Sequence, residues 1–200
     1  MAHLKPLATD THPRLVDDFQ TFERILGFVP NSLLTMQRCP EIVEGFGTLT
    51  RSIMSADGDC RGLVDLGFLR LAAHLSSRAA GCRYCQAHSL VAAQIHGVSE
   101  EKVDAIWDYK TSPLYSEAER AALDFAAAAG AVPNAVNDEI MANLKAHWTE
   151  EQIVRILAAV SLYGFLNRWN DSMATTLESA PKELADRALA PRGWDQGKHG

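Results

Sequence analysis

Two cysteines and a histidine follow one another at intervals of three residues in the segment from Cys82 to His88, which reads CRYCQAH. On a helix, residues three apart share a face, so the two sulfurs are close enough to form a disulfide, and the imidazole lies beside the second thiol. In such a group one thiolate attacks, the neighbouring thiol resolves the oxidised sulfur, and the histidine transfers protons. The pattern therefore predicts thiol redox chemistry at Cys82, Cys85 and His88.

Both sulfurs are candidates for the attacking atom. On an ideal helix, Cys82 and His88 each lie about 60° from Cys85, on opposite sides of it. The imidazole is therefore better placed to deprotonate Cys85, whereas Cys82 stands at the expected helix N-terminus, where backbone N–H groups stabilise a thiolate. We favour Cys85 as the attacker, and we expect Tyr84 to point away from the thiols.

The same cysteines have two other interpretations. Free cysteine is among the most buried residue types, so the pair could be structural. A closed zinc site needs four ligands, and the remaining cysteines, Cys39 and Cys60, are isolated in the sequence. We therefore expect no metal site and no tightly bound cofactor.

The composition describes an ordinary globular protein. The chain has 200 residues, of which 47% are hydrophobic and 22% charged, enough for one well-buried core. A net charge of −6 without any basic cluster argues against nucleic-acid and anionic-membrane partners. The sequence has no apolar run of transmembrane length and begins without the apolar stretch of a signal peptide. We therefore expect a cytoplasmic protein, in a compartment where permanent disulfides are rare.

Helix signals recur along the chain, and strand signals do not. Apolar residues three or four apart, a proline in a first turn and capping boxes at Ser116 and Thr149 are typical of helices. They predict helices over residues 14–26, 30–39, 40–54, 60–77, 82–96, 116–130, 150–177 and 182–189, with others beginning after Ser99 and Asn137. The fold class is all-α, with one domain over residues 1–190. The polar, glycine-rich residues 191–200 are expected to form a flexible tail.

The segment from Gly81 to His88 (GCRYCQAH) resembles the active-site signature of the carboxymuconolactone decarboxylase-like superfamily, in its alkylhydroperoxidase-D-like, peroxidase-related branch. The segments 28–31 (FVPN, followed by Pro40), 116–126 (SEAERAALDFA) and 165–168 (FLNR) are similar to other elements of that family. The resemblance implies a single helical bundle that forms oligomers. It also implies thiol-dependent reduction of a small hydroperoxide through a sulfenic acid and a disulfide, reset by an external dithiol that is a protein or a small molecule. The decarboxylases of the family lack the thiol pair, which disfavours decarboxylation.

Two positions depart from the family pattern. The relay histidine of the peroxidases stands where this chain has Ser89, so we transfer the role to His88. Their proton-accepting glutamate is replaced by Arg70, which stays protonated and could instead lower a thiol pKa or hold an anionic group of the substrate. Asp65 and His74, on the same expected helix, are the candidates to replace the carboxylate, together with any group from elsewhere in the chain.

The helices over 60–77 and 82–96, and parts of 150–177, are apolar on more than one face. A chain of this size has few helices left to cover those faces, which predicts a homo-oligomer. Asn167, Arg168 and Asn170 cluster on the last long helix, where we expect them to pair internally. Two other functions remain open: a non-catalytic redox-sensing or structural oligomer, and a cofactor-free base-catalysing enzyme of the same superfamily.

Overall fold

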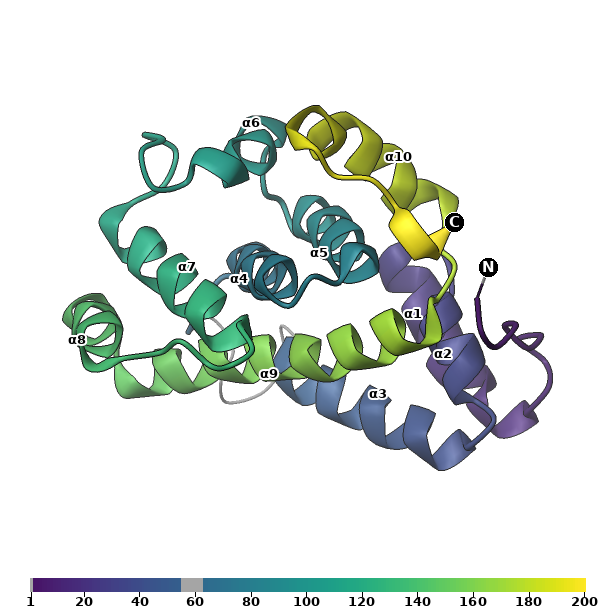
Figure 1. Ribbon diagram of the computed structural model, residues 1–200. Helices are drawn as coiled ribbons and strands as arrows, with labels where there is room; N and C mark the ends of the chain where they lie inside the picture. Colours follow the sequence, from purple (N-terminus) through teal and green to yellow (C-terminus); the bar gives the residue numbers. More distant parts are fainter. Residues whose placement is uncertain (1, 55–62) are drawn as a thin grey trace.

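The computed structural model describes residues 2–54 and 63–200, and every regular element within these ranges is helical (Figure 1). The all-α prediction is therefore confirmed. In chain order the helices are α1 (Val16–Leu26), α2 (Asn31–Met36), α3 (Pro40–Met54), α4 (Leu66–Ala79), α5 (Arg83–Ile95), α6 (Glu100–Asp104), α7 (Glu117–Gly130), α8 (Asp138–His147), α9 (Glu150–Met173) and α10 (Ser179–Ala188).

Helices α4 and α5 form the centre of the molecule. Helix α4 packs against α5, α7 and α9, and ten of its fourteen residues are buried. In Figure 1, α7 and α8 lie on one side of this central pair, α9 runs past it, and α10 lies on the other side. Gly130 at the end of α7 permits a close approach to α4, because a Cβ there would lie 2.5 Å from the Ser76 carbonyl oxygen. The surrounding helices therefore hold α5, which carries the cysteines, in a fixed position.

The helix starts follow the predicted caps. Ser116 and Thr149 both form complete capping boxes, and Ser99 and Asn137 cap α6 and α8. Helix α4 differs from the expectation that it would begin at residue 60. It begins at Leu66, because the Asp65 carboxylate accepts a hydrogen bond of 2.8 Å from the Phe68 backbone N–H and so caps the helix. Residues 60–62 and the turn predicted at 55–59 lie outside the described residues.

The long helix α9 ends at Met173 and not at residue 177 as predicted. Ala174 adopts a left-handed conformation with φ 47°, and the next amide, of Thr175, donates back to the Asn170 carbonyl at 3.1 Å. The chain then leads into α10, which packs against α5. The end of α9 thus decides where residues 175–178 lie.

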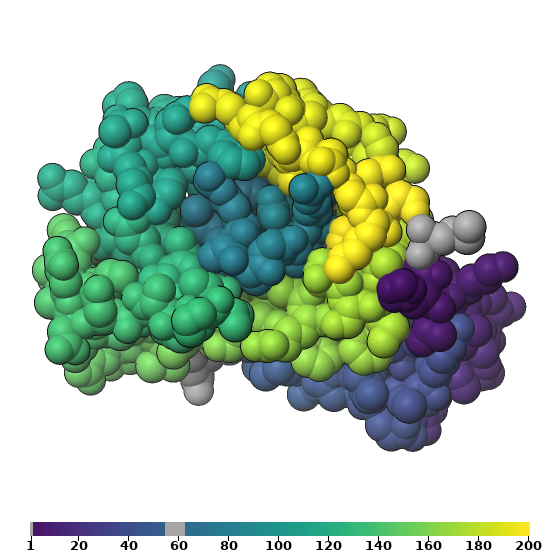
Figure 2. All heavy atoms as spheres, in the orientation of Figure 1, coloured from purple at the N-terminus to yellow at the C-terminus, as the bar shows by residue number. Residues whose placement is uncertain are grey.

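The last ten residues, for which the sequence predicts a flexible tail, contain short turns and buried side chains. They form two short 3₁₀ turns, Ala190–Arg192 and Gly197–His199, with the side chains of Trp194 and His199 buried. The His199 carbonyl accepts a hydrogen bond of 2.8 Å from the Leu177 N–H, and Asp195 forms an ion pair with Arg83. Figure 2 shows this segment, in yellow, lying against the central helices. Polar composition suggested mobility, but backbone hydrogen bonds and two buried rings fix the segment.

None of the helices in the described part of the chain combines the length and the apolar character needed to cross a membrane.

Candidate active site

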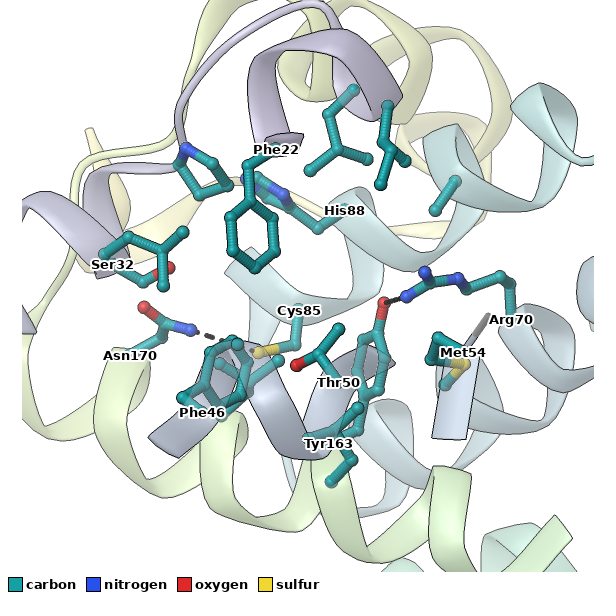
Figure 3. Close-up of a pocket in the computed structure, with 18 of the residues that line it drawn as sticks. Phe22, Ser32, Phe46, Thr50, Met54, Arg70, Cys85, His88, Tyr163 and Asn170 are labelled. Carbon is teal, nitrogen blue, oxygen red and sulfur yellow. Dashed lines mark hydrogen bonds between the residues drawn. The ribbon is translucent and has the colours of Figure 1, made fainter. Parts of the chain in front are cut away.

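A cavity of about 350 Å³ lies among α1, α3, α4, α5 and α9, and its lining is mainly apolar (Figure 3). Side chains that contribute to the apolar wall are Phe22, Leu26, Phe46, Met54, Leu162 and Leu166. Cys85 and His88, from successive turns of α5, both line the cavity. Its size is that of a pocket for a small organic molecule.

The two cysteines have different positions relative to this cavity. Cys82 is the N-cap of α5, and its Sγ accepts a long hydrogen bond of 3.4 Å from the Cys85 N–H. Both residues are buried and neither forms a disulfide. Cys85 faces the cavity, whereas Cys82 is absent from its lining. This arrangement favours Cys85 as the sulfur that meets a substrate and Cys82 as the resolving thiol.

The resting Cys85 thiol is protonated at neutral pH. Burial raises its pKa well above the ordinary value, and the adjacent Cys82 sulfur raises it further. Asn170 acts in the opposite direction, because its Nδ2 lies 3.5 Å from the Cys85 sulfur and stabilises the thiolate. Asn170 was expected to pair internally, and the structure instead places it at the reactive sulfur (Figure 3). Reaction at Cys85 therefore requires a base.

His88, which lines the same cavity as Cys85, is paired with Glu178. The His88 Nε2 lies 2.6 Å from the Glu178 Oε2, and both side chains are only 12% exposed. Burial alone would raise the pKa of Glu178, but the His88 imidazole and the Asn31 backbone N–H outweigh it and lower that pKa. Because the carboxylate accepts hydrogen bonds, the network assigns a proton to the His88 Nε2. The pair is thus a carboxylate-bound histidine that lines the same cavity as the Cys85 thiol.

Besides His88, two groups from other elements hold Glu178. Its Oε1 accepts hydrogen bonds from the Asn31 N–H at 2.5 Å and from the Tyr84 hydroxyl at 2.9 Å. Asn31 is the first residue of α2, where the backbone N–H groups have no partner within the helix, and its side chain also donates to the Thr176 carbonyl at 2.9 Å. The segment FVPN therefore positions the carboxylate. Sequence reasoning missed Glu178, which stands 90 residues from His88.

Tyr84 corrects the expectation that it would point away from the thiols. Its ring stacks on the His88 imidazole with the two centroids 4.2 Å apart, and it lines the same cavity. Burial, followed by the charge of Glu178, raises the pKa of Tyr84 well above its ordinary value. The hydroxyl therefore stays protonated, donates to Glu178, and holds the imidazole plane in place.

The other predicted relay residues do not reach the cavity. His74 is buried, and its Nδ1 lies 3.0 Å from the Gln86 carbonyl oxygen and 3.4 Å from the Ser89 hydroxyl. Burial lowers the pKa of His74 to about 4, so it is a neutral core histidine. Asp65 caps α4 and is likewise absent from the cavity lining. The carboxylate that contacts His88 is Glu178, a group from elsewhere in the chain.

Arg70, in the position of the expected glutamate, does line the cavity. One of its guanidinium nitrogens donates to the Tyr163 hydroxyl at 3.1 Å. Within residues 2–54 and 63–200, no three His, Cys, Asp or Glu side chains are grouped so as to hold a metal ion.

The chain is similar to several known proteins. Residues 40–128 match the Carboxymuconolactone decarboxylase family. The chain is 33% identical over 93 residues to the uncharacterized protein YnjA of Escherichia coli (strain K12), an alignment that spans 46% of this chain and half of YnjA.

Solved structures show the same architecture. The debrominase Bmp8 without ligand is 36% identical, with a TM-score of 0.85 over 92% of this chain and 96% of Bmp8. A cysteine-to-alanine variant of Bmp8 in complex with 2,3,4-tribromopyrrole is 35% identical, with the same TM-score and coverage. A peroxidase-related protein with an alkylhydroperoxidase AhpD core, from Ralstonia eutropha JMP134, is 24% identical, with a TM-score of 0.70 over 85% of this chain and 88% of its own. The last similarity shows the fold alone.

Proposed function

We propose that this chain, which belongs to the carboxymuconolactone decarboxylase-like superfamily, is a thiol oxidoreductase that reduces a small, largely apolar electrophile. One observation carries this proposal: Cys85 and the Glu178-paired His88 line the same apolar cavity, with the resolving Cys82 directly behind Cys85. A buried thiol with an adjacent base and a neighbouring thiol has the parts that a two-electron reduction needs.

The reaction proceeds in two steps at the sulfurs. His88 takes the Cys85 proton, and the resulting thiolate attacks the electrophilic atom of the substrate. The Cys82 thiol, losing its own proton, then displaces the group carried by the Cys85 sulfur and forms the disulfide. The two thiols together give up two electrons and two protons, and an external dithiol returns them.

Reductive dehalogenation is the candidate that the cavity favours. In this reaction a carbon–bromine bond and two thiols give a carbon–hydrogen bond, a disulfide, one bromide and one proton. Hydrogen peroxide, only a few tens of Å³ in volume, would leave most of a 350 Å³ cavity empty, whereas a halogenated ring would occupy more of it. The similarity to the debrominase Bmp8 over nearly the whole chain supports the same candidate.

Reduction of an organic hydroperoxide is the second candidate. It yields an alcohol, water and the same disulfide, and it is supported by the fold shared with peroxidase-related proteins. An apolar cavity can also accept the organic part of such a peroxide. The two candidates use the same residues and differ in the atom that Cys85 attacks, which is bromine in one and oxygen in the other.

Anaerobic single-turnover measurements test the proposal. The reduced protein is mixed with 2,3,4-tribromopyrrole or with cumene hydroperoxide, and bromide, organic product and the Cys82–Cys85 disulfide are quantified. We expect one disulfide per bromide or per alcohol formed, and continued turnover when a dithiol is added. The Cys85→Ser variant should be inactive, and the Cys39→Ser variant, which alters an exposed thiol, should be unaffected.

Three outcomes of that experiment count against the proposal. A disulfide that forms without catalytic turnover in excess dithiol would identify a redox sensor. Activity that survives Cys85→Ser would identify a base catalyst. If neither substrate oxidised the Cys82–Cys85 pair, both candidate reactions, dehalogenation and hydroperoxide reduction, would be contradicted.

We also propose that the protein forms a homo-oligomer. A groove between α3 and α9 is lined by the partly exposed side chains of Ile42, Leu49 and Phe165, and α9 exposes Val154 and Leu157 as well. Neighbouring apolar side chains of this number on one side of a protein are typical of an interface, and a second copy is the usual occupant.

A further inference from the structure

The charges that line the active-site cavity are all of one sign. Among the described residues, two arginines and two histidines contribute to its wall, and no aspartate or glutamate does. The chain as a whole has a net charge of −6, so this selection runs against its overall composition. An arginine in an apolar cavity needs a partner that compensates its charge.

The two arginines differ in whether they have such a partner. Arg51 forms a salt bridge of 3.1 Å with Asp18, and its side chain is 53% exposed. Arg70 has no carboxylate partner within the described part of the chain. Its one hydrogen bond there runs to the Tyr163 hydroxyl at 3.1 Å, and its Nε is buried without an acceptor. Arg70 therefore has donors available toward the cavity.

Other unpaired polar atoms line the same cavity. Thr50 Oγ1 and His96 Nε2 are buried without a hydrogen-bond partner among the described residues. Burial and the adjacent Arg70 charge lower the pKa of His96, so this imidazole is neutral and able to donate or accept one hydrogen bond. Figure 3 shows Arg70 reaching Tyr163, with Thr50 between them and Cys85. These atoms form a polar patch in an otherwise apolar wall.

The contacts of Cys85 and of Arg70 are separate. Among the described residues, the Asn170 amide lies 3.5 Å from the Cys85 sulfur, whereas Arg70 donates its hydrogen bond to the Tyr163 hydroxyl. The positive charge of Arg70 is thus available to a different anion, located in the cavity with the substrate.

We propose that Arg70 binds an acidic group of the substrate, so that the substrate is a small, mainly apolar ring compound carrying one carboxylate or comparable oxyanion. This inference rests on the proposed function and narrows its substrate class. A guanidinium binds a carboxylate through two parallel hydrogen bonds, which fixes the orientation of the whole ligand. The ion pair with Arg70 would thereby select which atom of the ring faces the Cys85 sulfur.

A matched pair of ligands tests the inference without any turnover. Binding of 4,5-dibromopyrrole-2-carboxylate and of its neutral methyl ester is measured by calorimetry on the Cys85→Ser variant. We expect the acid to bind at least about tenfold more tightly than the ester. Adding Arg70→Gln should lower the affinity for the acid by about 30-fold or more and the affinity for the ester by less than about threefold, because only the acid loses a buried charge partner.

Arg51→Gln is the matched control, because Arg51 contributes to the same cavity but is already paired with Asp18. It should change the affinity for the acid by less than about threefold. Arg70→Lys keeps the charge but loses the two-pronged geometry, so it should lie between the wild type and Arg70→Gln. If Arg70→Gln does not fold, the acid–ester comparison and Arg70→Lys decide the question.

Equal binding of acid and ester, or an equal loss of both in Arg70→Gln, would overturn the inference. These outcomes are separate from a failure of the proposed function, because binding to Cys85→Ser needs no redox step. Selective binding of the acid without oxidation of the thiols would support the anion site and contradict the proposed oxidoreductase function. Turnover of 2,3,4-tribromopyrrole, together with equal binding of the acid and the ester, would support the oxidoreductase function and contradict the anion site.

Discussion

Replacing Glu178 by glutamine is the most direct test of the base assigned to this site. The change keeps the shape of the side chain and one oxygen for the Asn31 N–H and the Tyr84 hydroxyl. The amide then presents N–H groups to the His88 Nε2, where the carboxylate oxygen now lies at 2.6 Å. His88 would have to turn a lone pair toward the amide and carry its proton on Nδ1, the nitrogen that should accept the Cys85 proton.

The expected loss follows from that change of tautomer. A positioned general base contributes about 10² to 10⁴ in rate, and an amide in place of an orienting carboxylate removes much of this contribution. We therefore expect Cys85 to react about 100- to 1,000-fold more slowly at pH 7 in Glu178→Gln, which corresponds to about 3–4 kcal/mol in activation free energy. Tyr84→Phe is the milder comparison, because it removes one neutral hydrogen bond and should reduce the rate by about fivefold to tenfold.

Stopped-flow measurement of single-turnover oxidation of the Cys82–Cys85 pair between pH 6 and 10 provides the assay. The burial-raised pKa of Cys85 means that the thiolate forms without help only at high pH. The deficit of Glu178→Gln should therefore shrink as the pH rises. A variant that reacts within threefold of the wild type at every pH, while remaining folded by circular dichroism, would refute the assignment of Glu178 and His88 as the base.

Three further predictions concern the thiols, the core and the surface. When the native variants are treated with iodoacetamide, peptide mapping should show alkylation of Cys85 in Cys82→Ser and no alkylation of Cys82 in Cys85→Ser. The reverse result would exchange the roles of the two cysteines. Because the pKa of His74 is about 4 when folded and 6.5 when unfolded, the unfolded chain takes up the proton first as the pH falls, so stability is full above pH 6.5 and decreases toward pH 4. Urea denaturation should show this contribution as about 2–3 kcal/mol lost between pH 7 and 4.5 in the wild type and absent in His74→Gln, and identical profiles would contradict it. Light scattering should give an oligomer for the wild type and a single chain for Val154→Asp, and a wild type of single-chain mass at all concentrations would exclude the proposed interface.

The local parts of the fold and site were predictable from sequence. Capping boxes such as that at Ser116 involve residues within one turn, so their outcome depends on few other contacts. The juxtaposition of Cys82, Cys85 and His88 depends only on the helical repeat. Arg70 was identified by its position relative to the first cysteine, and the structure places it at the cavity.

The remaining parts depend on contacts between distant segments. Glu178 reaches His88 because α9 ends at Met173, and the chain leads from there into α10, which packs against α5. Neither the left-handed residue nor the direction of that turn has a clear signature, since Ala174 is not a glycine. The predicted orientation of Tyr84 was wrong for the same reason, because its hydroxyl donates a hydrogen bond to Glu178, which was not predicted.

The contact between Leu177 and His199 also links the site to the last residues that are added during protein synthesis. Most of the cavity wall, and Cys85 itself, lie in residues 21–170 and are made first. The carboxylate that orients His88 arrives later, and its neighbour Leu177 is fixed by the His199 carbonyl. A nascent chain that ends before residue 178 therefore lacks the carboxylate that lies 2.6 Å from the His88 imidazole. The pairing of Glu178 with His88 is thus one of the last contacts of the site that protein synthesis can complete.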